Sequence, residues 1–194
     1  MTEALPSIVR GTQRVLHRVA TTPGLDPLAD TCAVAFGRLM RRQPAASEAL
    51  HGGWLGHAVH PLLTDFTDGP WMGASFLDLF GPDGSSDAAR RLVGFGLLAS
   101  VPTLLSGFLD WEATEGAERR VGLLHAATSI AATALYGCSY LARRRGRQRA
   151  GAVLGLLGGT VAFVDGYIGG ELSLVGRIGT GRRLGHAAAG PQAQ

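Results

Sequence analysis

Long apolar runs without Asp, Glu, Lys or Arg limit how this chain can fold. Such runs cover residues 92–109, 121–142 and 150–164. An α-helix rises about 1.5 Å per residue, so about 20 residues cross the roughly 30 Å hydrocarbon core of a bilayer. The first two runs have about this length, and the third reaches it if its helix continues to about Val175. Because a soluble helix of that length normally keeps one charged face, the sequence predicts membrane-spanning helices.

A fourth, more polar segment at residues 61–80 contains Asp65, Asp68 and Asp78. Beside three apolar segments it is predicted to be a fourth span whose carboxylates face protein rather than lipid. The four segments are joined by short polar stretches at residues 81–89, 111–120 and 143–149. Because short connections make neighbouring helices antiparallel, we expect an all-α fold, a four-helix up-down transmembrane bundle that forms a domain over residues 51–180.

Residues 1–50 have an amphipathic rather than a uniformly apolar pattern. One helical face carries Leu5, Ile8, Val9, Leu16 and Val19, and another carries Arg10, Arg14 and Arg18. A second helix is predicted to start at Asp26, as its N-cap, with Pro27 as its first residue. We expect N-terminal amphipathic helices that lie on the membrane or dock on the bundle, with a soluble helix pair as the alternative. Residues 181–194 are expected to form a flexible tail.

Composition narrows the class of protein further. Hydrophobic residues make up 46% of the chain and charged residues 17%, which excludes a disordered chain. The net charge is +3 and every basic residue is Arg, without a patch interleaved with aromatic residues. We therefore expect the lipid bilayer as a partner and no nucleic acid. Cys32 and Cys138 are isolated and predict no zinc or iron–sulfur cluster.

The orientation in the membrane stays open. The five arginines of residues 143–149 favour the cytoplasmic side for that joint. The six arginines of residues 1–50, with no evident signal peptide, favour a cytoplasmic N-terminus, which up-and-down threading places on the opposite side. Whether the chain forms a homo-oligomer is open as well.

Up-and-down threading brings titratable side chains from distant positions to the end of the bundle nearest the termini. They are His57, His60, Asp110, His125, Asp165 and Glu171. His125 is expected one turn into its helix, roughly 6 Å deep. Pro61 favours a helix that starts at or near His60, which leaves His57 in the preceding turn. Ionisable groups inside a membrane normally face the bundle interior and pair with one another.

Three kinds of chemistry fit such a cluster. Imidazoles can ligate a transition metal such as zinc or non-haem iron, with carboxylates orienting their second nitrogens. Two imidazoles on different helices can hold a b-type haem, and a chain of acids and imidazoles can conduct protons or ions. We expect His60 and His125 to be the ligands, with His57 as the alternate. The carboxylates expected to orient them or to handle protons are Asp65, Asp110 and Asp165. A polar network that only fixes helix register is the structural alternative.

The string GHAVHPLLTDFTDGP, followed by LLHA and VDGYIGGEL, resembles a bacterial membrane protein family named domain of unknown function 2231. The resemblance covers about residues 48–180 and implies four spans in the bacterial plasma membrane, with no established activity. Some relatives are joined to a Rieske-type iron–sulfur domain, which implies a redox setting and a Rieske-type or other redox protein as partner. This chain has no CxH…CxxH pattern of its own. The family pattern falls on His57, His60, Pro61, Asp65, Asp110, Trp111, His125, Gly169 and Gly170.

The chain departs from that pattern at Ala58 and at Thr67, where relatives commonly have proline, and at Glu171, where many have histidine. If that histidine is a ligand, Glu171 becomes a candidate metal ligand, and a metal or proton site is favoured over haem. We expect a multi-pass membrane protein that holds a haem or metal centre near one membrane face, as a partner in electron transfer. A structural or assembly subunit without a cofactor and a proton or ion conduit are the alternatives. No nucleophile–base–oxyanion arrangement is visible, so hydrolysis is not expected.

Overall fold

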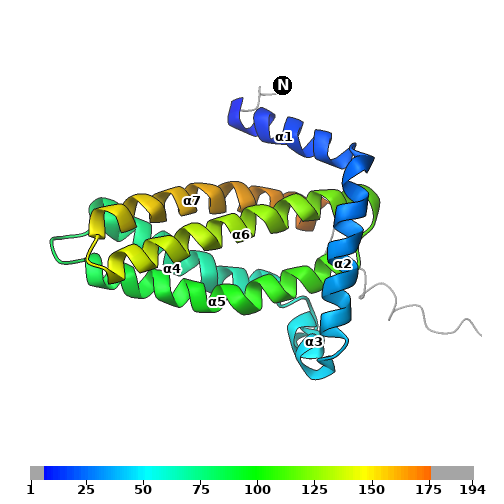
Figure 1. The fold of residues 1–194 in the computed structure, drawn as a ribbon, viewed down its shortest axis with the longest axis horizontal. Coiled ribbons are helices and arrows are strands. Elements are labelled where there is room, and N and C mark those ends of the chain that lie inside the picture. The colour runs from blue at the N-terminus through cyan, green and yellow to red at the C-terminus, as the bar shows by residue number, and fades with distance from the viewer. Residues whose placement is uncertain (1–6, 176–194) are drawn as a thin grey trace, which may run out of the picture.

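The computed structural model describes residues 7–175, and this part of the chain is all-α, as predicted (Figure 1). Its α-helices are α1 (Ser7–Ala20), α2 (Asp26–Met40), α3 (Pro44–His51), α4 (His60–Phe80), α5 (Ser86–Glu112), α6 (Gly116–Arg144) and α7 (Gln148–Gly170). Short helical turns at Pro23–Leu25 and Gly53–Leu55 connect the first elements, and a π-helical turn at Glu171–Val175 follows α7. The tail predicted at residues 181–194 lies outside the described residues.

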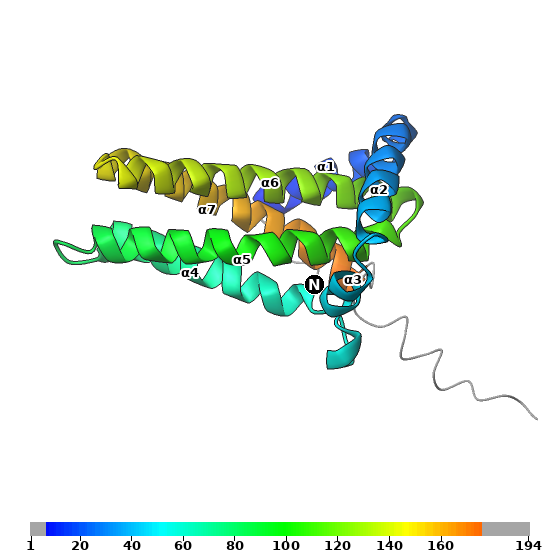
Figure 2. The same cartoon turned by 60° about the horizontal axis from the view of Figure 1, so that its bottom comes forward.

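The four long helices α4 to α7 pack side by side, each running back along the one before it (Figures 1 and 2). α4 packs on α5, α5 on α6, α6 on α7, and α7 returns to α4, so the helices enclose a common interior. Within the described residues, three helices are long and apolar enough to cross a membrane: Ser86–Glu112, Gly116–Arg144 and Gln148–Leu174. The prediction of these three candidate spans is confirmed, whereas α4 does not meet the same criterion.

All three predicted joints are shorter than the sequence indicated. α4 ends at Phe80 and α5 begins at Ser86, so residues 81–85 replace the predicted joint at 81–89. α5 continues to Glu112 and α6 begins at Gly116, so residues 113–115 replace the predicted joint at 111–120. Likewise only residues 145–147 separate α6 from α7. The helices extend past their apolar runs because arginines near their ends bind carboxylates on other helices: Arg119 to Asp30, Arg120 to Asp26, and Arg143 to Asp78.

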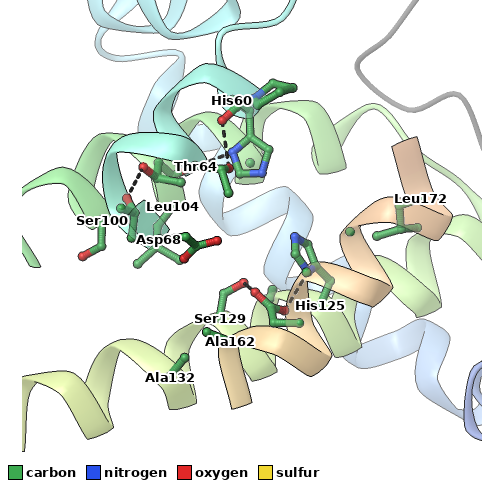
Figure 3. Close-up of a pocket in the computed structure, with 18 of the residues that line it drawn as sticks. His60, Thr64, Asp68, Ser100, Leu104, His125, Ser129, Ala132, Ala162 and Leu172 are labelled. Carbon is green, nitrogen blue, oxygen red and sulfur yellow. Dashed lines mark hydrogen bonds and ion pairs between the residues drawn. The ribbon is translucent and has the colours of Figure 1, made fainter. Parts of the chain in front are cut away.

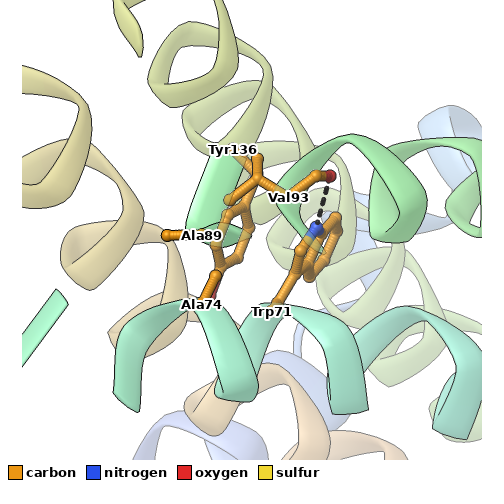
Figure 4. Packing of buried hydrophobic residues seen from close by; sticks show 5 residues of the cluster. All are labelled: Trp71, Ala74, Ala89, Val93 and Tyr136. Carbon is orange, nitrogen blue, oxygen red and sulfur yellow. Dashed lines mark hydrogen bonds between the residues drawn. The ribbon is translucent and has the colours of Figure 1, made fainter. Parts of the chain in front are cut away.

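The apolar core of the bundle centres on two stacked rings. The Trp71 and Tyr136 ring centroids lie 4.0 Å apart with an interplanar angle of 14°. Ala74, Ala89 and Val93 complete the cluster (Figure 4). The indole N–H of Trp71 donates to the carbonyl of Val93 on α5 at 3.4 Å. This hydrogen bond joins α4 to α5, and the stacked rings join α4 to α6.

Small residues spaced four apart on α7 allow α6 and α7 to approach closely. Gly151 and Gly155 on α7 are buried. A Cβ added to Gly151 would lie 2.4 Å from Cγ of Arg143, and one added to Gly155 would lie 3.3 Å from the Ser139 hydroxyl. Glycine therefore makes room for the Arg143 side chain between the helices.

That arginine forms a buried ion pair with Asp78 at the end of the bundle formed by the α4–α5 and α6–α7 joints. Their side chains are 1% and 6% exposed. Nη1 of Arg143 donates to Oδ1 of Asp78 at 2.9 Å, Nη2 donates to Oδ2, and Nε donates to the Ser139 hydroxyl at 3.2 Å. Because Asp78 lies on α4, the pair ties the first helix of the bundle to the third.

The N-terminal helices dock at the opposite end, where α2 runs across the ends of α5 and α6 (Figures 1 and 2). Ala29 and Ala33 of α2 pack on Trp111. α1 and α2 lie where amphipathic helices were predicted, although the sequence did not indicate α3. The side chains of Ile8 and Val9, and all of Leu5, lie outside the described residues.

Asp26 starts α2 as predicted, but its predicted role as an N-cap is wrong. Its side chain caps no backbone N–H and instead accepts two hydrogen bonds from Arg120, at 2.6 and 2.8 Å. This guanidinium holds the pKa of the Asp26 carboxyl below its usual value. The stronger interaction for this carboxylate is therefore with a charged partner rather than with a helix end.

Replacing Asp78 with alanine should destabilise the fold by about 3–5 kcal/mol, because it leaves the buried Arg143 guanidinium without its partner. Thermal unfolding in mild detergent measures the loss. Asp87→Ala is the matched control, since its pair with Arg90 is exposed, and it should have little effect. The double variant Asp78→Leu/Arg143→Met should regain most of the stability. Equal melting of Asp78→Ala and the native protein would contradict this account.

Candidate functional site

A cavity of about 310 Å³ lies inside the bundle and is lined by residues of α4, α5, α6 and α7. Its walls combine apolar side chains such as Leu104 and Phe108 with polar ones from every helix. The titratable residues among the lining are His60, Asp68, Asp110, His125 and Asp165. Figure 3 shows His60 and Asp68 on one side and His125 on the other.

His60 is the first residue of α4, and Pro61 follows it in the first turn, as predicted. Its Nδ1 lies 3.0 Å from the carbonyl oxygen of Thr103 and 3.2 Å from the Ser106 hydroxyl, both on α5. Since a carbonyl oxygen only accepts, Nδ1 carries the proton in the neutral ring. The ring reaches α5 because residue 107 is glycine: a Cβ there would lie 2.8 Å from Cε1 of His60.

His125 is paired with Asp165 across the α6–α7 interface. Its Nδ1 lies 2.7 Å from Oδ1 of Asp165, although without the alignment of a hydrogen bond. The same carboxylate accepts hydrogen bonds from the hydroxyls of Thr128 and, at 2.6 Å, Ser129. A Cβ on Gly169 would lie 3.1 Å from Cε1 of His125, so a second glycine makes room for a ring. Asp165 is thus fixed by three side chains of α6.

The two imidazoles face each other across the cavity (Figure 3). Their ring centroids are 6.4 Å apart and their planes are nearly perpendicular, at 83°. Within the described residues, the polar contacts of both rings are made by Nδ1, which leaves both Nε2 atoms for the cavity. The predicted meeting of His60 and His125 is therefore found. His125 is deeper than expected, because α6 begins at Gly116 and nine residues correspond to about 14 Å.

Asp68 is the cavity carboxylate that the predicted site omitted. It lies on the same face of α4 as His60 and Thr64, at four-residue steps, and that spacing was a usable signal. Its side chain points toward the interior in Figure 3. Thr103, Ser106, Thr128 and Ser129 were also missed. Such hydroxyls are common in membrane helices, and only the helix register shows which of them meet an imidazole or a carboxylate.

Other predicted site residues lie outside the cavity lining. His57 is exposed, and its Nδ1 contacts the carbonyl of the neighbouring Ala58 at 2.9 Å. Asp65 is also exposed, since it is one residue out of step with the face that carries His60. Glu171 accepts a hydrogen bond from the Tyr167 hydroxyl at 3.2 Å. Unlike these three residues, the predicted site residue Asp110 does line the cavity.

Within residues 7–175, no three or more His, Cys, Asp or Glu side chains are grouped so that they could hold a metal ion. A metal ion in this arrangement would have the two Nε2 atoms as protein ligands and would keep open coordination positions. The same cavity also brings together two acids and two imidazoles, those of Asp165, His125, His60 and Asp68.

Comparison with known proteins gives one family. No curated protein and no solved structure matches the chain. The family DUF2231, described as a predicted membrane protein, matches residues 56–182. This match covers α4 to α7 and more than half of the chain, and it agrees with the resemblance seen in the sequence. The chain therefore belongs to the DUF2231 family of predicted membrane proteins.

Proposed function

We propose that this chain is a four-span membrane protein that holds a single transition-metal ion between His60 and His125. The observation that carries the proposal is the arrangement of the two imidazoles, with each Nδ1 against a protein oxygen and each Nε2 toward one cavity. Metal-ligating histidines normally have their second nitrogen held in this way by a carbonyl or a carboxylate.

The outer surface of α4 supports a fourth span. Large apolar side chains are exposed along its length: Leu62, Phe66, Met72, Phe76, Leu79 and Phe80. Its 21 residues extend about 31 Å, which is enough to cross the hydrocarbon core. Of its acids, Asp68 lines the cavity and Asp78 is paired with Arg143. The exposed Asp65 lies five residues, about one and a half turns, after the start of the helix, near one end of the bundle.

The spacing of the rings suits a shared ion. A metal–nitrogen distance of about 2.0–2.1 Å on each side sets the centroids of two ligating imidazoles roughly 5–6.5 Å apart, depending on the angle at the ion. The centroids of His60 and His125 are 6.4 Å apart. Imidazole ligands suit zinc, copper, iron and nickel. A redox-active ion such as copper or iron would supply the electron-transfer role expected from the sequence.

A b-type haem fits this site less well than a bare ion does. A porphyrin ring needs space on all sides of its iron. At Gly107 and Gly169 the helix backbones lie against the Cε1 atoms next to the ligating nitrogens, so that space is not free. A Cβ at these positions would already lie 2.8 Å and 3.1 Å from those atoms. Glu171 is occupied by Tyr167 and does not line the cavity, so we do not include it or His57 among the ligands.

The purified protein, incubated with Cu²⁺ or Zn²⁺ and desalted, should retain about one ion per chain by elemental analysis. His60→Ala and His125→Ala should abolish retention, and Asp165→Asn should weaken metal affinity about 10- to 100-fold, because it disturbs the group that orients His125. His57→Ala is the matched control and should bind normally. Equal retention by His60→Ala/His125→Ala and the native protein would refute the site.

A proton pathway is the second candidate, favoured by the two carboxylates, Asp68 and Asp165, that share the cavity with the imidazoles. Proteoliposomes with metal-free protein distinguish the two functions. After a pH step, a proton pathway should acidify the lumen, and Asp68→Asn and Asp165→Asn should abolish this acidification. If that result is obtained and the protein retains no metal, the proton pathway replaces the metal site as the proposed function.

Single cysteines at Trp54 and Asp83 should be labelled from opposite sides of the membrane, because α4 lies between them. Cys32→Ser and Cys138→Ser provide the background. A membrane-impermeant maleimide applied to sealed vesicles of known orientation makes the measurement. A cysteine at Arg145, between α6 and α7, is the control and should react from the same side as Asp83. Labelling of positions 54 and 83 from one side would mean that α4 does not cross.

A further inference from the structure

The volume of the cavity is much larger than an ion requires. A water molecule takes about 30 Å³ of liquid volume, and an apolar cavity of about 150 Å³ can hold one benzene molecule. The cavity here, at about 310 Å³, is roughly twice that size. Its walls include the side chains of Leu104, Phe108, Ala126, Ala132 and Ala162. An apolar-walled space of this size inside a membrane bundle suits a small organic molecule better than a cluster of water.

We propose that this cavity binds a small hydroxylated aromatic compound, which enters from the bilayer between α4 and α7. This inference concerns the metal-free cavity, in which both Nε2 atoms can accept a hydrogen bond. It does not depend on whether the protein also binds a metal ion. We infer the aromatic ring of the ligand from the volume of the cavity and from its apolar walls. We infer the hydroxyl of the ligand from the polar groups that line the cavity.

Those polar groups are mainly acceptors. Nδ1 of His60 donates to the Thr103 carbonyl, so its Nε2 accepts in the neutral ring. Nδ1 of His125 lies against the Asp165 carboxylate, which leaves its Nε2 as an acceptor too. The Asp68 carboxylate adds further acceptor oxygens. A ligand that donates through a hydroxyl can satisfy these atoms, whereas a plain hydrocarbon cannot.

The entrance is the seam between the start of α4 and the end of α7. Pro61 on α4 and Gly166 on α7 both line the cavity and are both exposed on the outside of the described structure. A Cβ added to Gly166 meets no atom of the described residues within 4 Å, so open space lies beside it. At the end of the bundle, Trp111 lines the cavity and is covered by Ala29 and Ala33 of α2. Entry from the side is therefore more open than entry past α2.

Tryptophan fluorescence can report binding, because Trp71 and Trp111 line the cavity while Trp54 is 69% exposed outside it. Trp54→Phe protein, stripped of metal and held in lipid nanodiscs, is titrated with para-bromophenol, whose bromine quenches indole fluorescence. We expect saturable quenching. Bromobenzene has the same ring without the hydroxyl and should bind about five- to tenfold more weakly, as the loss of one hydrogen bond predicts.

Two glycine variants test the entrance. Gly166→Phe should slow para-bromophenol association at least tenfold, because its ring fills the seam. Gly137→Phe on α6 is the matched control: a Cβ there also meets no atom within 4 Å, but the residue does not line the cavity. It should bind as the parent does. Gly166→Leu replaces Gly166→Phe if the larger side chain lowers the melting temperature.

His125→Ala separates this inference from the metal proposal. It should weaken para-bromophenol about fivefold and leave bromobenzene unchanged, since only the hydroxyl uses the ring. If the protein retains no metal ion in the earlier experiment, the expected binding of the two bromo compounds does not change. Non-saturable quenching, equal binding of the two bromo compounds, or equal association rates in the Gly166 and Gly137 variants would overturn the proposal.

Discussion

A charged side chain within the hydrocarbon core of a bilayer costs at least 2.5–3.5 kcal/mol at the centre of a helix, and this penalty organises the interior of the bundle. Polar groups that α4 to α7 carry inward are stabilised by partners on other helices. Asp78 has Arg143, Asp165 has His125 with Thr128 and Ser129, and His60 has the Thr103 carbonyl and Ser106. These contacts link helices that are distant in sequence, so the polar groups specify which helix faces meet. Apolar packing in lipid lacks that selectivity, because lipid chains are as apolar as the side chains they replace.

The polar contacts differ between the two ends of the bundle. At one end, the guanidinium of Arg143 fills the space between α4, α6 and α7, and Gly151 and Gly155 close the helices around it. At the other end, ion pairs connect α2 and the residue that follows it to α5 and α6. They are Arg41–Glu112, Arg119–Asp30 and Arg120–Asp26. These ion pairs hold the N-terminal helices on the outside of the bundle. They leave space in the interior that α4, α5, α6 and α7 enclose. The cavity therefore lies at the end where the bundle is held from outside rather than through its centre.

Much of this arrangement could be predicted from the sequence, and the reasons for the misses are physical. The lengths of the apolar runs predicted the three candidate spans, and antiparallel threading alone predicted that His60, His125 and Asp165 lie at one end. Arg143 was assigned to a joint because it begins a run of arginines; nothing local distinguishes it from Arg144, which is exposed. Asp65 and Asp68 differ by less than one helical turn, yet one is exposed and the other lines the cavity. Such distinctions depend on helix rotation, which periodicity defines poorly in a segment that is apolar on several faces.

Glycine connects the packing of the bundle with its chemistry. Gly107 and Gly169 each leave room for an imidazole against a helix backbone, where an added Cβ would lie 2.8 Å and 3.1 Å from the Cε1 atoms of His60 and His125. Nδ1 of each ring also lies close to a protein oxygen, so both rings are positioned without any bound group. A site prepared in this way loses little conformational entropy when it binds an ion or a hydroxyl, because the ordering is already part of the folded state.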